Sequence, residues 1–334
     1  MASSPNPILS VVLPCFNERE NLQPLHARLA PLLEKITEHF EVIFVDDGSS
    51  DGCSEMLDEL HRHDPRFKVI HFSRNFGHQA ALSAGLDAST GAAVVLMDCD
   101  LQDPPEVIED FVRAWRAGHE VVYGVRRKRK EGLLKRAGYA VFYRSMRLVA
   151  QIEVPLDAGD FCLMDRKVVD ALKRLPEAHR FLRGLRSWVG FRQTGIEYER
   201  QGRHAGEPKY TFSKLVRLAV SGYVGFSTVP LRIASWLGLA CAGIGFGIAI
   251  WAVGTKLLGI PSPRGWASNM AVMLFLGGIQ LLVLGVMGEY LGRVYDEARA
   301  RPSYVVRERV GFDERVERGG ERMESGGRAV RRQL

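Results

Sequence analysis

The chain has 334 residues, and its 46% hydrophobic and 25% charged residues exclude a largely disordered protein. The formal net charge is +6, but residues 126–147 alone hold nine basic side chains against one acidic one. The charge therefore marks one basic patch on a chain that is otherwise slightly acidic. The five cysteines show no metal-binding spacing, so we interpret them as reduced, apolar residues of a cytosolic domain.

The first 125 residues alternate between short β-branched runs and longer amphipathic stretches. We expect strands at 8–13, 42–45, 68–71, 93–97 and 120–123. Helices are expected from near Asn17, where Asn17 and Glu20 have capping-box spacing, and at 53–63, 77–88 and 105–117. This alternation predicts an α/β fold, with a mainly parallel sheet covered by helices on both faces.

Acidic residues follow the second expected strand, beginning with Asp46 and Asp47 and ending with Asp51. Ligands of open α/β sheets bind beyond the carboxyl ends of the strands, so these carboxylates suit hydrogen bonds to a base and a ribose. The alternative is a strand-to-helix turn in which Asp51 caps the next helix.

A second acidic segment, with Asp98, Asp100 and Gln102, follows the fourth expected strand. In an extended chain alternate residues point to the same side, so these oxygens would converge on one hard cation such as Mg²⁺ or Mn²⁺. The alternative is a solvated acidic turn. We expect Asp103 to cap the following helix.

Further charged groups follow, and a strand is expected at 161–164. Asp157 and Asp160, just before that strand, would orient an acceptor, act as a base or cap a turn. Basic side chains that suit phosphates or anionic lipid head groups are Arg126, the run 127–130, Lys135, Arg136, Arg203 and Lys209. No nucleic-acid-binding motif is present, so we expect no nucleic-acid partner.

Two uncharged runs near the C-terminal end predict a membrane hairpin. They span 23 residues between Arg232 and Lys256 and 24 between Arg264 and Glu289. Each exceeds the roughly 20 residues that cross a bilayer as a helix. Amphipathic helices expected at 134–149 and 212–223 suit the membrane interface. Basic outer flanks, and the lack of signal-peptide features, favour a catalytic domain and both termini in the cytoplasm.

Five motifs and this hairpin occur in an order that resembles one family. The motifs are Pro14-Cys15-Phe16-Asn17-Glu18, Val45-Asp46-Asp47-Gly48-Ser49, Arg74-Asn75-Phe76-Gly77, Asp98-Cys99-Asp100-Leu101-Gln102-Asp103-Pro104 and Asp157-Ala158-Gly159-Asp160-Phe161. Over about residues 8–305 the chain resembles the bacterial polyisoprenyl-phosphate glycosyltransferases, relatives of dolichol-phosphate mannose synthase. The resemblance implies an inverting GT-A domain of glycosyltransferase family 2.

The resemblance also implies a reaction and its partners. A hexose, glucose from UDP-glucose in the bacterial branch, would move to undecaprenyl phosphate, giving a lipid-linked donor for cell-envelope glycans such as lipopolysaccharide. UDP-N-acetylhexosamines and GDP-mannose remain open as donors. The implied setting is the bacterial inner membrane, with Mg²⁺ or Mn²⁺ as cofactor and room for a homo-oligomer such as a tetramer.

By motif match, the resemblance assigns roles to individual residues. The nucleotide sugar would contact Pro14, Asn17, Glu18, Asp46, Asp47, Ser49, Asp98, Arg203 and Lys209. The metal would be held by Asp98, Asp100 and Gln102, and the acceptor phosphate by Arg126, Lys135 and Arg136. Catalytic roles would fall to Asp157, Asp100 and Asp160.

Two residues depart from the family pattern. Cys99 stands where alanine is commoner, and we expect its side chain to point away from the metal. Pro208 replaces a serine or threonine before Lys209, which leaves the contacts of that loop open.

These assignments divide the chain into a GT-A domain (1–210), a juxtamembrane segment (211–232), two spans (233–255 and 265–288) and a partly disordered tail (289–334). Two rivals remain. A processive polysaccharide synthase needs a QxxRW motif, which the segment 183–188 only resembles, and a channel of several helices. A membrane-tethered protein that binds nucleotide sugars without catalysis is the other.

Overall fold

The computed structural model describes residues 8–126, 158–177, 180–200, 229–258 and 265–312. Contacts divide the chain into two units. The first, here the sheet unit, comprises 1–130, 154–207 and 302–334, and the second, the hairpin unit, comprises 131–153 and 208–301. Expected helices at 134–149 and 212–223 lie outside the described residues.

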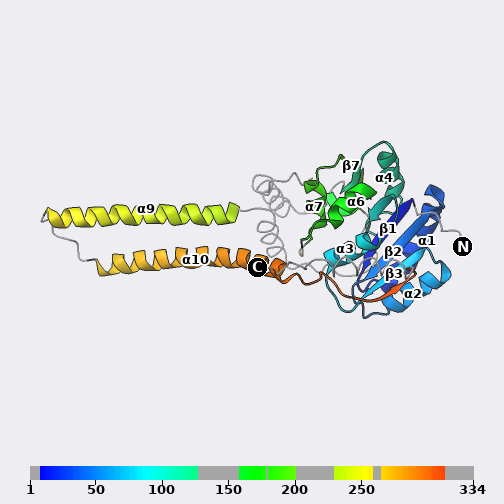
Figure 1. Ribbon diagram of the computed structural model, residues 1–334, viewed down its shortest axis with the longest axis horizontal. Coiled ribbons are helices and arrows are strands. Elements are labelled where there is room, and N and C mark those ends of the chain that lie inside the picture. The colour runs from blue at the N-terminus through cyan, green and yellow to red at the C-terminus, as the bar shows by residue number, and fades with distance from the viewer. Residues whose placement is uncertain (1–7, 127–157, 178–179, 201–228, 259–264, 313–334) are drawn as a thin grey trace, which may run out of the picture. The chain divides into compact units, whose positions relative to one another are not determined.

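The sheet unit is built on eight strands in the order β7-β5-β6-β4-β1-β2-β3-β8 (Figure 1). Their bounds are β1 Leu9–Cys15, β2 Phe40–Asp46, β3 Phe67–Phe72, β4 Ala93–Leu96, β5 Val121–Arg126, β6 Ala158–Asp165, β7 Gln193–Tyr198 and β8 Val306–Val310. The strand β6 is antiparallel to both neighbours and β8 is antiparallel to β3, while the other pairings are parallel. The mainly parallel sheet expected from the sequence is therefore confirmed.

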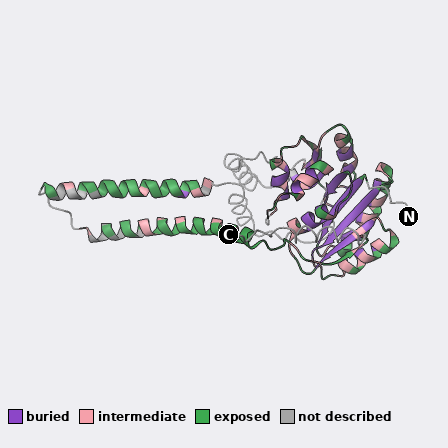
Figure 2. Ribbon diagram, in the orientation of Figure 1, coloured by how far each residue is buried: buried purple, intermediate pink, exposed green. Residues whose placement is uncertain are grey.

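Helices cover both faces of the sheet and bury two apolar layers (Figure 2). On one face lie α1 Arg19–Ile36, α2 Cys53–His63 and α4 Val107–Arg116, and on the other lie α3 His78–Ala88, α6 Arg166–Lys173 and α7 Leu182–Trp188. The four central strands β1, β2, β3 and β4 are almost continuously buried, as a sheet covered on two sides requires. Expected elements in this unit lie within three residues of those observed.

The start of α1 differs from the expected capping box. The helix begins at Arg19 with Glu18 as N-cap, and no side chain caps it from that position. Asn17 has φ 54° and its side-chain oxygen accepts a hydrogen bond from the Ser50 amide instead. Asp51 takes over the capping, because its two oxygens accept from the amides of Arg19 and Cys53 at the starts of α1 and α2.

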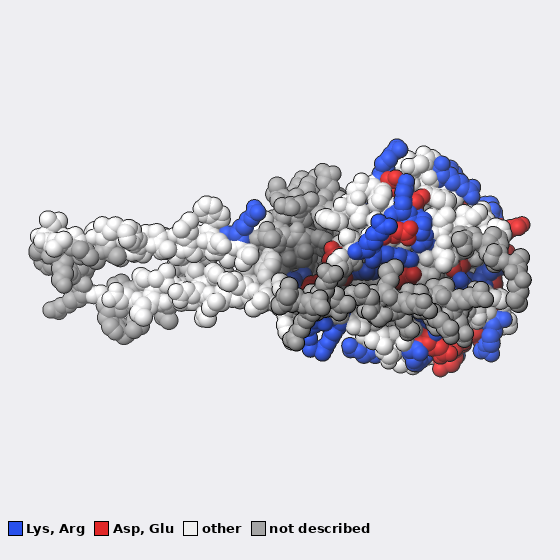
Figure 3. Space-filling model, viewed as in Figure 1, with Lys and Arg blue, Asp and Glu red and all other residues white. Residues whose placement is uncertain are grey.

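The hairpin unit contains two long helices, α9 Val229–Leu257 and α10 Trp266–Arg299, which lie side by side (Figure 1). At 1.5 Å per residue their 29 and 34 residues extend for about 44 and 51 Å, more than the roughly 30 Å of bilayer hydrocarbon. Both pass the length and hydropathy requirements of a membrane span. The visible surface of the hairpin is almost free of charge, unlike that of the sheet unit (Figure 3).

Residues 289–312 form a helix end and a strand, whereas the sequence predicted a partly disordered tail over 289–334. Helix α10 continues to Arg299, and β8 then joins the sheet beside β3. The Ser73 amide donates to the Val305 carbonyl, and the ring of Tyr304 stacks on Phe72 at 5.1 Å. Apolar residues within this charged segment thus complete the edge of the sheet. The expectation of disorder beyond Phe312 lies outside the described residues.

Candidate functional site

The predicted acidic segments meet at one edge of the sheet. Parallel strands β1, β2 and β4 end there, and antiparallel β6 begins there. The chain runs from β1 outward through β2 to β3 and then crosses to β4 on the other side of β1. A reversal of strand order of this kind opens a crevice at the carboxyl edge, where ligands of open α/β sheets bind.

Asp46 lies at the end of β2 with 1% of its surface exposed, and its oxygens are held by neighbouring groups. It accepts from the Ser49 amide at 2.9 Å and the Ser54 hydroxyl at 2.5 Å, and its Oδ2 lies 3.0 Å from Nδ1 of His71. Burial opposes ionisation, but these bonds, led by that of His71, outweigh it and lower the pKa of Asp46 to about 2. Asp46 therefore remains a carboxylate that orders the β2–α2 loop.

Asp47 braces a different loop. Its two oxygens accept from the amides of Phe76 and Gly77 at 2.6 and 2.9 Å. The adjacent Gly48 has φ +70°, and a Cβ there would lie 2.6 Å from the backbone of Arg74. Burial raises the pKa of Asp47. Both predicted nucleotide ligands thus lie at the expected edge, with oxygens engaged by the loops around the crevice.

The β1–α1 loop joins the same cluster. The Asn17 amide donates to the Ser49 hydroxyl at 3.1 Å, and the Asn17 side chain accepts from the Ser50 amide at 2.9 Å. Glu18 accepts from the Asn21 side chain, and Pro14 lies buried in β1. These predicted donor-binding residues are brought together by hydrogen bonds between two loops.

Asp98 and Asp100 lie on a turn after β4, whereas the sequence argument assumed an extended segment. Leu101 has φ 57°, and the Gln102 amide donates to Asp100 at 3.1 Å. The premise that alternate side chains point to one side is therefore wrong here, because the chain bends through that turn. Asp98 instead pairs with Nε2 of His78 at 2.8 Å.

The turn is nevertheless suited to a hard cation. The described residues contain no cluster of three His, Cys, Asp or Glu side chains arranged to hold a metal. Mg²⁺, however, commonly binds through one or two carboxylates while substrate phosphates and water supply the other oxygens. Asp98 and Asp100 provide two such carboxylates. Although burial opposes it, His78, Arg126 and Arg200 lower the pKa of Asp98, which keeps it ionised.

Asp103 does not cap α4, whose N-cap is Glu106. It is buried and accepts a hydrogen bond from the Tyr198 hydroxyl of β7. Arg126 and Arg200 approach its carboxylate at 3.9 and 3.6 Å. Asp103 is therefore a buried counter-charge for Arg126 and Arg200. The positive charges of the same two arginines help to lower the pKa of Asp98.

Arg126, the predicted phosphate ligand, ends β5 and its side chain is 21% exposed. Its Nε lies 3.4 Å from the Tyr198 hydroxyl, and a Cβ on Gly159 would come within 3.2 Å of its guanidinium. Burial opposes its charge, but Asp103 and Tyr198 raise the pKa of Arg126. It is therefore a permanent cation beside the acidic turn, with part of its surface open to an anion.

Asp160, a predicted catalytic residue, lies in β6 and pairs with Arg183 of α7 at 3.1 Å. It also contributes, with Asp98, to a raised pKa of His78 despite the opposing effect of burial. Arg186, in the segment that resembles a processive-synthase motif, is 2% exposed and stacks over Tyr123 at 5.3 Å.

Several neighbours of the site were not foreseen from the sequence. His78 directly follows the matched segment 74–77, a position that could have drawn attention to it. The partnership of Asp103 with Tyr198 joins residues 95 positions apart and has no local signal. The remaining predicted site residues, Lys135, Arg136, Asp157, Arg203 and Lys209, lie outside the described residues.

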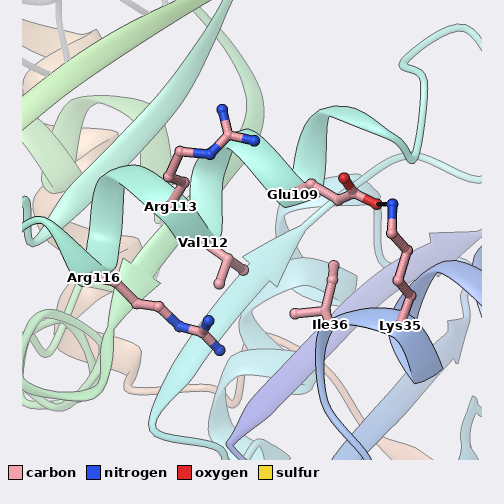
Figure 4. A pocket seen from close by; sticks show the side chains of 6 residues that line it. All are labelled: Lys35, Ile36, Glu109, Val112, Arg113 and Arg116. Carbon is pink, nitrogen blue, oxygen red and sulfur yellow. Dashed lines mark hydrogen bonds and ion pairs between the residues drawn. The ribbon is translucent and has the colours of Figure 1, made fainter.

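A surface hollow lies between the last residues of α1 and helix α4, on the face of the sheet that both helices cover (Figure 4). Lys35 and Glu109 form an ion pair of 2.8 Å beside it, and Arg113 and Arg116 also line it. Its charged groups are already paired or exposed to solvent. We assign it no role in the site.

Comparisons with known proteins agree with this arrangement. The model described as glycosyl transferase family 2 matches residues 10–173, and that described as the GtrB C-terminal hairpin matches 229–294. An uncharacterized glycosyltransferase, YkcC of Bacillus subtilis, is 46% identical over 91% of this chain and 94% of its own. The bactoprenol glucosyl transferase of Shigella phage SfX is 40% identical over 90% of this chain and 99% of its own.

A solved structure to which the chain is similar is glucosyl-3-phosphoglycerate synthase from Mycobacterium tuberculosis, in complex with Mn²⁺, UDP and glucosyl-3-phosphoglycerate. It is 19% identical, covers 66% of this chain and 78% of its own, and has a TM-score of 0.46.

Proposed function

The chain belongs to glycosyltransferase family 2, and from that premise we propose that it transfers glucose from UDP-glucose to the phosphate of undecaprenyl phosphate, with inversion. The observation that carries this proposal is the juxtaposition of an acidic turn and Arg126 at one edge of the sheet, in a chain that also contains an apolar hairpin. Relatives named bactoprenol glucosyl transferase match both parts.

For the donor, we assign Asp98 and Asp100 to a divalent cation, Mg²⁺ or Mn²⁺, with Gln102 beside them. Such a cation, when bound, neutralises the negative charge that develops on the departing nucleoside diphosphate. Asp46 and Asp47 act mainly by holding the loops of Ser49 and Gly77 in place around the nucleotide. Asn17, Glu18 and Pro14 support the same wall of the crevice.

For the acceptor, we assign Arg126, with Lys135 and Arg136, to the lipid phosphate. A phosphate monoester with a second pKa near about 6 is mostly dianionic at neutral pH, so its oxygen is already nucleophilic. The difficulty is to bring a dianion towards Asp98 and Asp100, and a fixed guanidinium offsets that repulsion. Asp157 is then an orienting group rather than an obligatory base, while Asp160 fixes Arg183.

The apolar hairpin would hold the site at the membrane, where its lipid acceptor lies. The acceptor phosphate lies at the level of the head groups while its chain stays in lipid, and anchoring the enzyme there converts a three-dimensional search into a local one. We place the catalytic domain and both termini on the cytoplasmic side of the inner membrane. The lipid product would supply glucose for modification of cell-envelope glycans.

The full-length protein in detergent or lipid nanodiscs tests this proposal. It is incubated with undecaprenyl phosphate, Mg²⁺ or Mn²⁺ and, in turn, UDP-glucose, UDP-N-acetylglucosamine and GDP-mannose, and the lipid is analysed by mass spectrometry. We expect a single hexose on the lipid, only with UDP-glucose, and a β linkage by NMR.

The matched control is the Asp98→Asn variant, which keeps the size of the side chain and should form product at least about 100-fold more slowly. If sugar is transferred from another donor and not from UDP-glucose, the proposed donor is wrong. A sugar polymer would instead support the processive synthase, and an absence of transfer despite nucleotide binding would support the tethered binding protein.

A further inference from the structure

Three buried cysteines lie beneath the carboxyl edge of the sheet. Cys15 ends β1, Cys99 lies in the acidic turn after β4, and Cys53 is the first residue of α2. Their exposed fractions are 1%, 2% and 0%. The Sγ atoms of Cys15 and Cys99 are 2.6 Å apart, and all three cysteines are free thiols.

The sheet register accounts for the contact between Cys15 and Cys99. The strands β1 and β4 are parallel, with Leu9 opposite Ala93 and Val12 opposite Leu96. Cys15 and Cys99 are separated by the same 84 residues, and their sulfurs meet just beyond the last paired residues of β4. Neighbouring strands are about 4.8 Å apart, within the Cα separations of about 4.4–6.8 Å that disulfides span.

We propose that Cys15 and Cys99 form a redox modification site, in which a small peroxide joins them in a reversible disulfide that impairs donor binding. The backbone already holds the two sulfurs side by side, so a bond requires only a short movement of side chains. The proposed loss of donor binding, unlike the bond itself, rests on the function proposed above.

The reaction balances with hydrogen peroxide as the oxidant. One sulfur, as its thiolate, attacks a peroxide oxygen, and the O–O bond breaks to give a sulfenic acid and, after protonation, one water. The second thiol attacks that sulfur, forms the S–S bond and loses its proton, while the hydroxyl leaves as the second water. Two thiols are oxidised and one peroxide is reduced, and a dithiol reductant reverses the change.

The location of the pair links oxidation to the site. Cys99 lies between Asp98 and Asp100, and Cys15 lies two residues before Asn17. A covalent bond would fix the acidic turn to the β1–α1 loop at the crevice between β1 and β4. Asp98 and Asp100, the carboxylates proposed to hold the cation, are the two neighbours of Cys99, so the bond would restrict the turn that carries them.

A third thiol, that of Cys53, competes for Cys15. Burial raises the pKa of the Cys15 thiol. Cys53 differs, because a hydrogen bond from Cys15 lowers its pKa, which makes it the competing partner that an experiment must distinguish.

The test begins with reduced full-length protein in nanodiscs, from which the reductant is removed before treatment with hydrogen peroxide. Proteolysis without reduction and mass spectrometry map the cross-linked peptides. We expect a Cys15–Cys99 linkage that dithiothreitol reverses. A Cys15–Cys53 linkage, or no linkage when exposed methionines are already oxidised, would overturn the proposal.

Two variants test whether the Cys15–Cys99 bond is the cause of the loss of donor binding. Cys99→Ala, with Cys99→Ser as a second version in case of poor folding, should lose the linkage and become insensitive to peroxide. Cys162→Ala removes another buried cysteine, in β6, and should stay as sensitive as the unaltered protein. We expect oxidation to raise the KM for UDP-glucose at least about 5-fold, the lower end of typical coupling between two sites.

Equal peroxide sensitivity in Cys99→Ala would contradict the coupling to donor binding. The mapping requires no enzymatic turnover, so it stands even if the protein proves inactive with UDP-glucose. Failure of the proposed function and failure of the thiol modification are therefore distinguished by separate measurements.

Discussion

The two edges of the sheet each contain a carboxylate with a lowered pKa, but they use it differently. At the amino edge, Glu41 is 2% exposed and accepts from the hydroxyl of Ser10 at 2.6 Å, Lys68 at 2.8 Å and the amide of Thr90 at 2.7 Å. At the carboxyl edge, the side chain of Asp98 remains 32% exposed and pairs with His78, which is itself 43% exposed. The first carboxylate is enclosed, and the second faces solvent.

This contrast shows that a perturbed pKa alone does not locate the site. Burial opposes ionisation of both Glu41 and Asp98, and in both cases hydrogen bonds and nearby cations lower the pKa. What separates them is access and topology, since only Asp98 lies partly exposed at the edge where the strand order reverses. Replacing each residue should therefore affect different properties.

The largest effect is expected at the open edge. Asp98→Asn removes a charge proposed to hold the cation, and we expect kcat/KM to fall about 100- to 1,000-fold, as for other groups that stabilise charge in a transition state. Hydrogen exchange of the β4 amides should stay unchanged. The measurement is glucosyl-lipid formation by mass spectrometry.

Asp157→Asn serves as the comparison for this prediction, because a dianionic acceptor needs little help from a base. It should retain much more activity than Asp98→Asn. An equal loss, with nucleotide binding intact, would identify Asp157 as an obligatory group.

A substitution at the amino edge should instead lower the free energy of unfolding. Glu41→Gln leaves Lys68 without its partner and costs about 1–3 kcal/mol, the range for an unsatisfied buried polar group. Hydrogen exchange of β1 and β2 in the full-length protein measures the loss. kcat/KM per folded molecule should be unchanged, and a fall comparable to that of Asp98→Asn would remove the distinction between the two edges.

A smaller effect is expected at Arg126. Arg126→Lys keeps the charge but loses the planar fork, which matches phosphate oxygens in pairs. We expect the KM for undecaprenyl phosphate to rise about 10-fold, equivalent to one weakened charged hydrogen bond. The KM for UDP-glucose should stay constant, and a rise in that value instead would assign Arg126 to the donor.

A pH dependence of stability is expected around Asp46 and His71. The folded pKa of Asp46 is lowered from 3.8 to about 2, so its contribution of about 2 kcal/mol is present above pH 3.8 and is lost as the pH falls towards 2. Burial opposes the charge of His71, but Asp46 and Asp58 raise its pKa above 6.5. Its contribution is present below pH 6.5 and is lost as the pH rises through the raised value.

Protection of β2 and β3 against hydrogen exchange should therefore be greatest between about pH 4 and pH 6.5, after correction for intrinsic exchange rates. His71→Asn should abolish the decline above pH 6.5. The exposed His63 provides the control, because His63→Asn should leave the profile unaltered.

Local patterns in the sequence predicted much of this fold. The β-branched runs matched strands β1 to β5, and the acidic residues that follow β2 and β4 lie at one edge because parallel strands end together. The conformation within the acidic turn was not predictable, since Leu101 has φ 57° and no glycine marks that position in the sequence. The prediction that Asp103 caps a helix was wrong because its partner, Tyr198, lies 95 residues away in the sequence. No local pattern indicates a contact of that kind.

The strand β8 has a consequence for the order in which the protein is made. It lies 107 residues beyond β7, after the whole hairpin, and it covers the edge of β3. At about 5–20 residues per second, roughly 5–20 s of translation pass before β8 follows β7 out of the ribosome. During that interval β3 is an uncovered edge, which is prone to pairing with other chains. Completion of the sheet is thus coupled to synthesis of the hairpin, so a chain truncated within the hairpin carries an exposed edge strand that quality-control proteins can recognise.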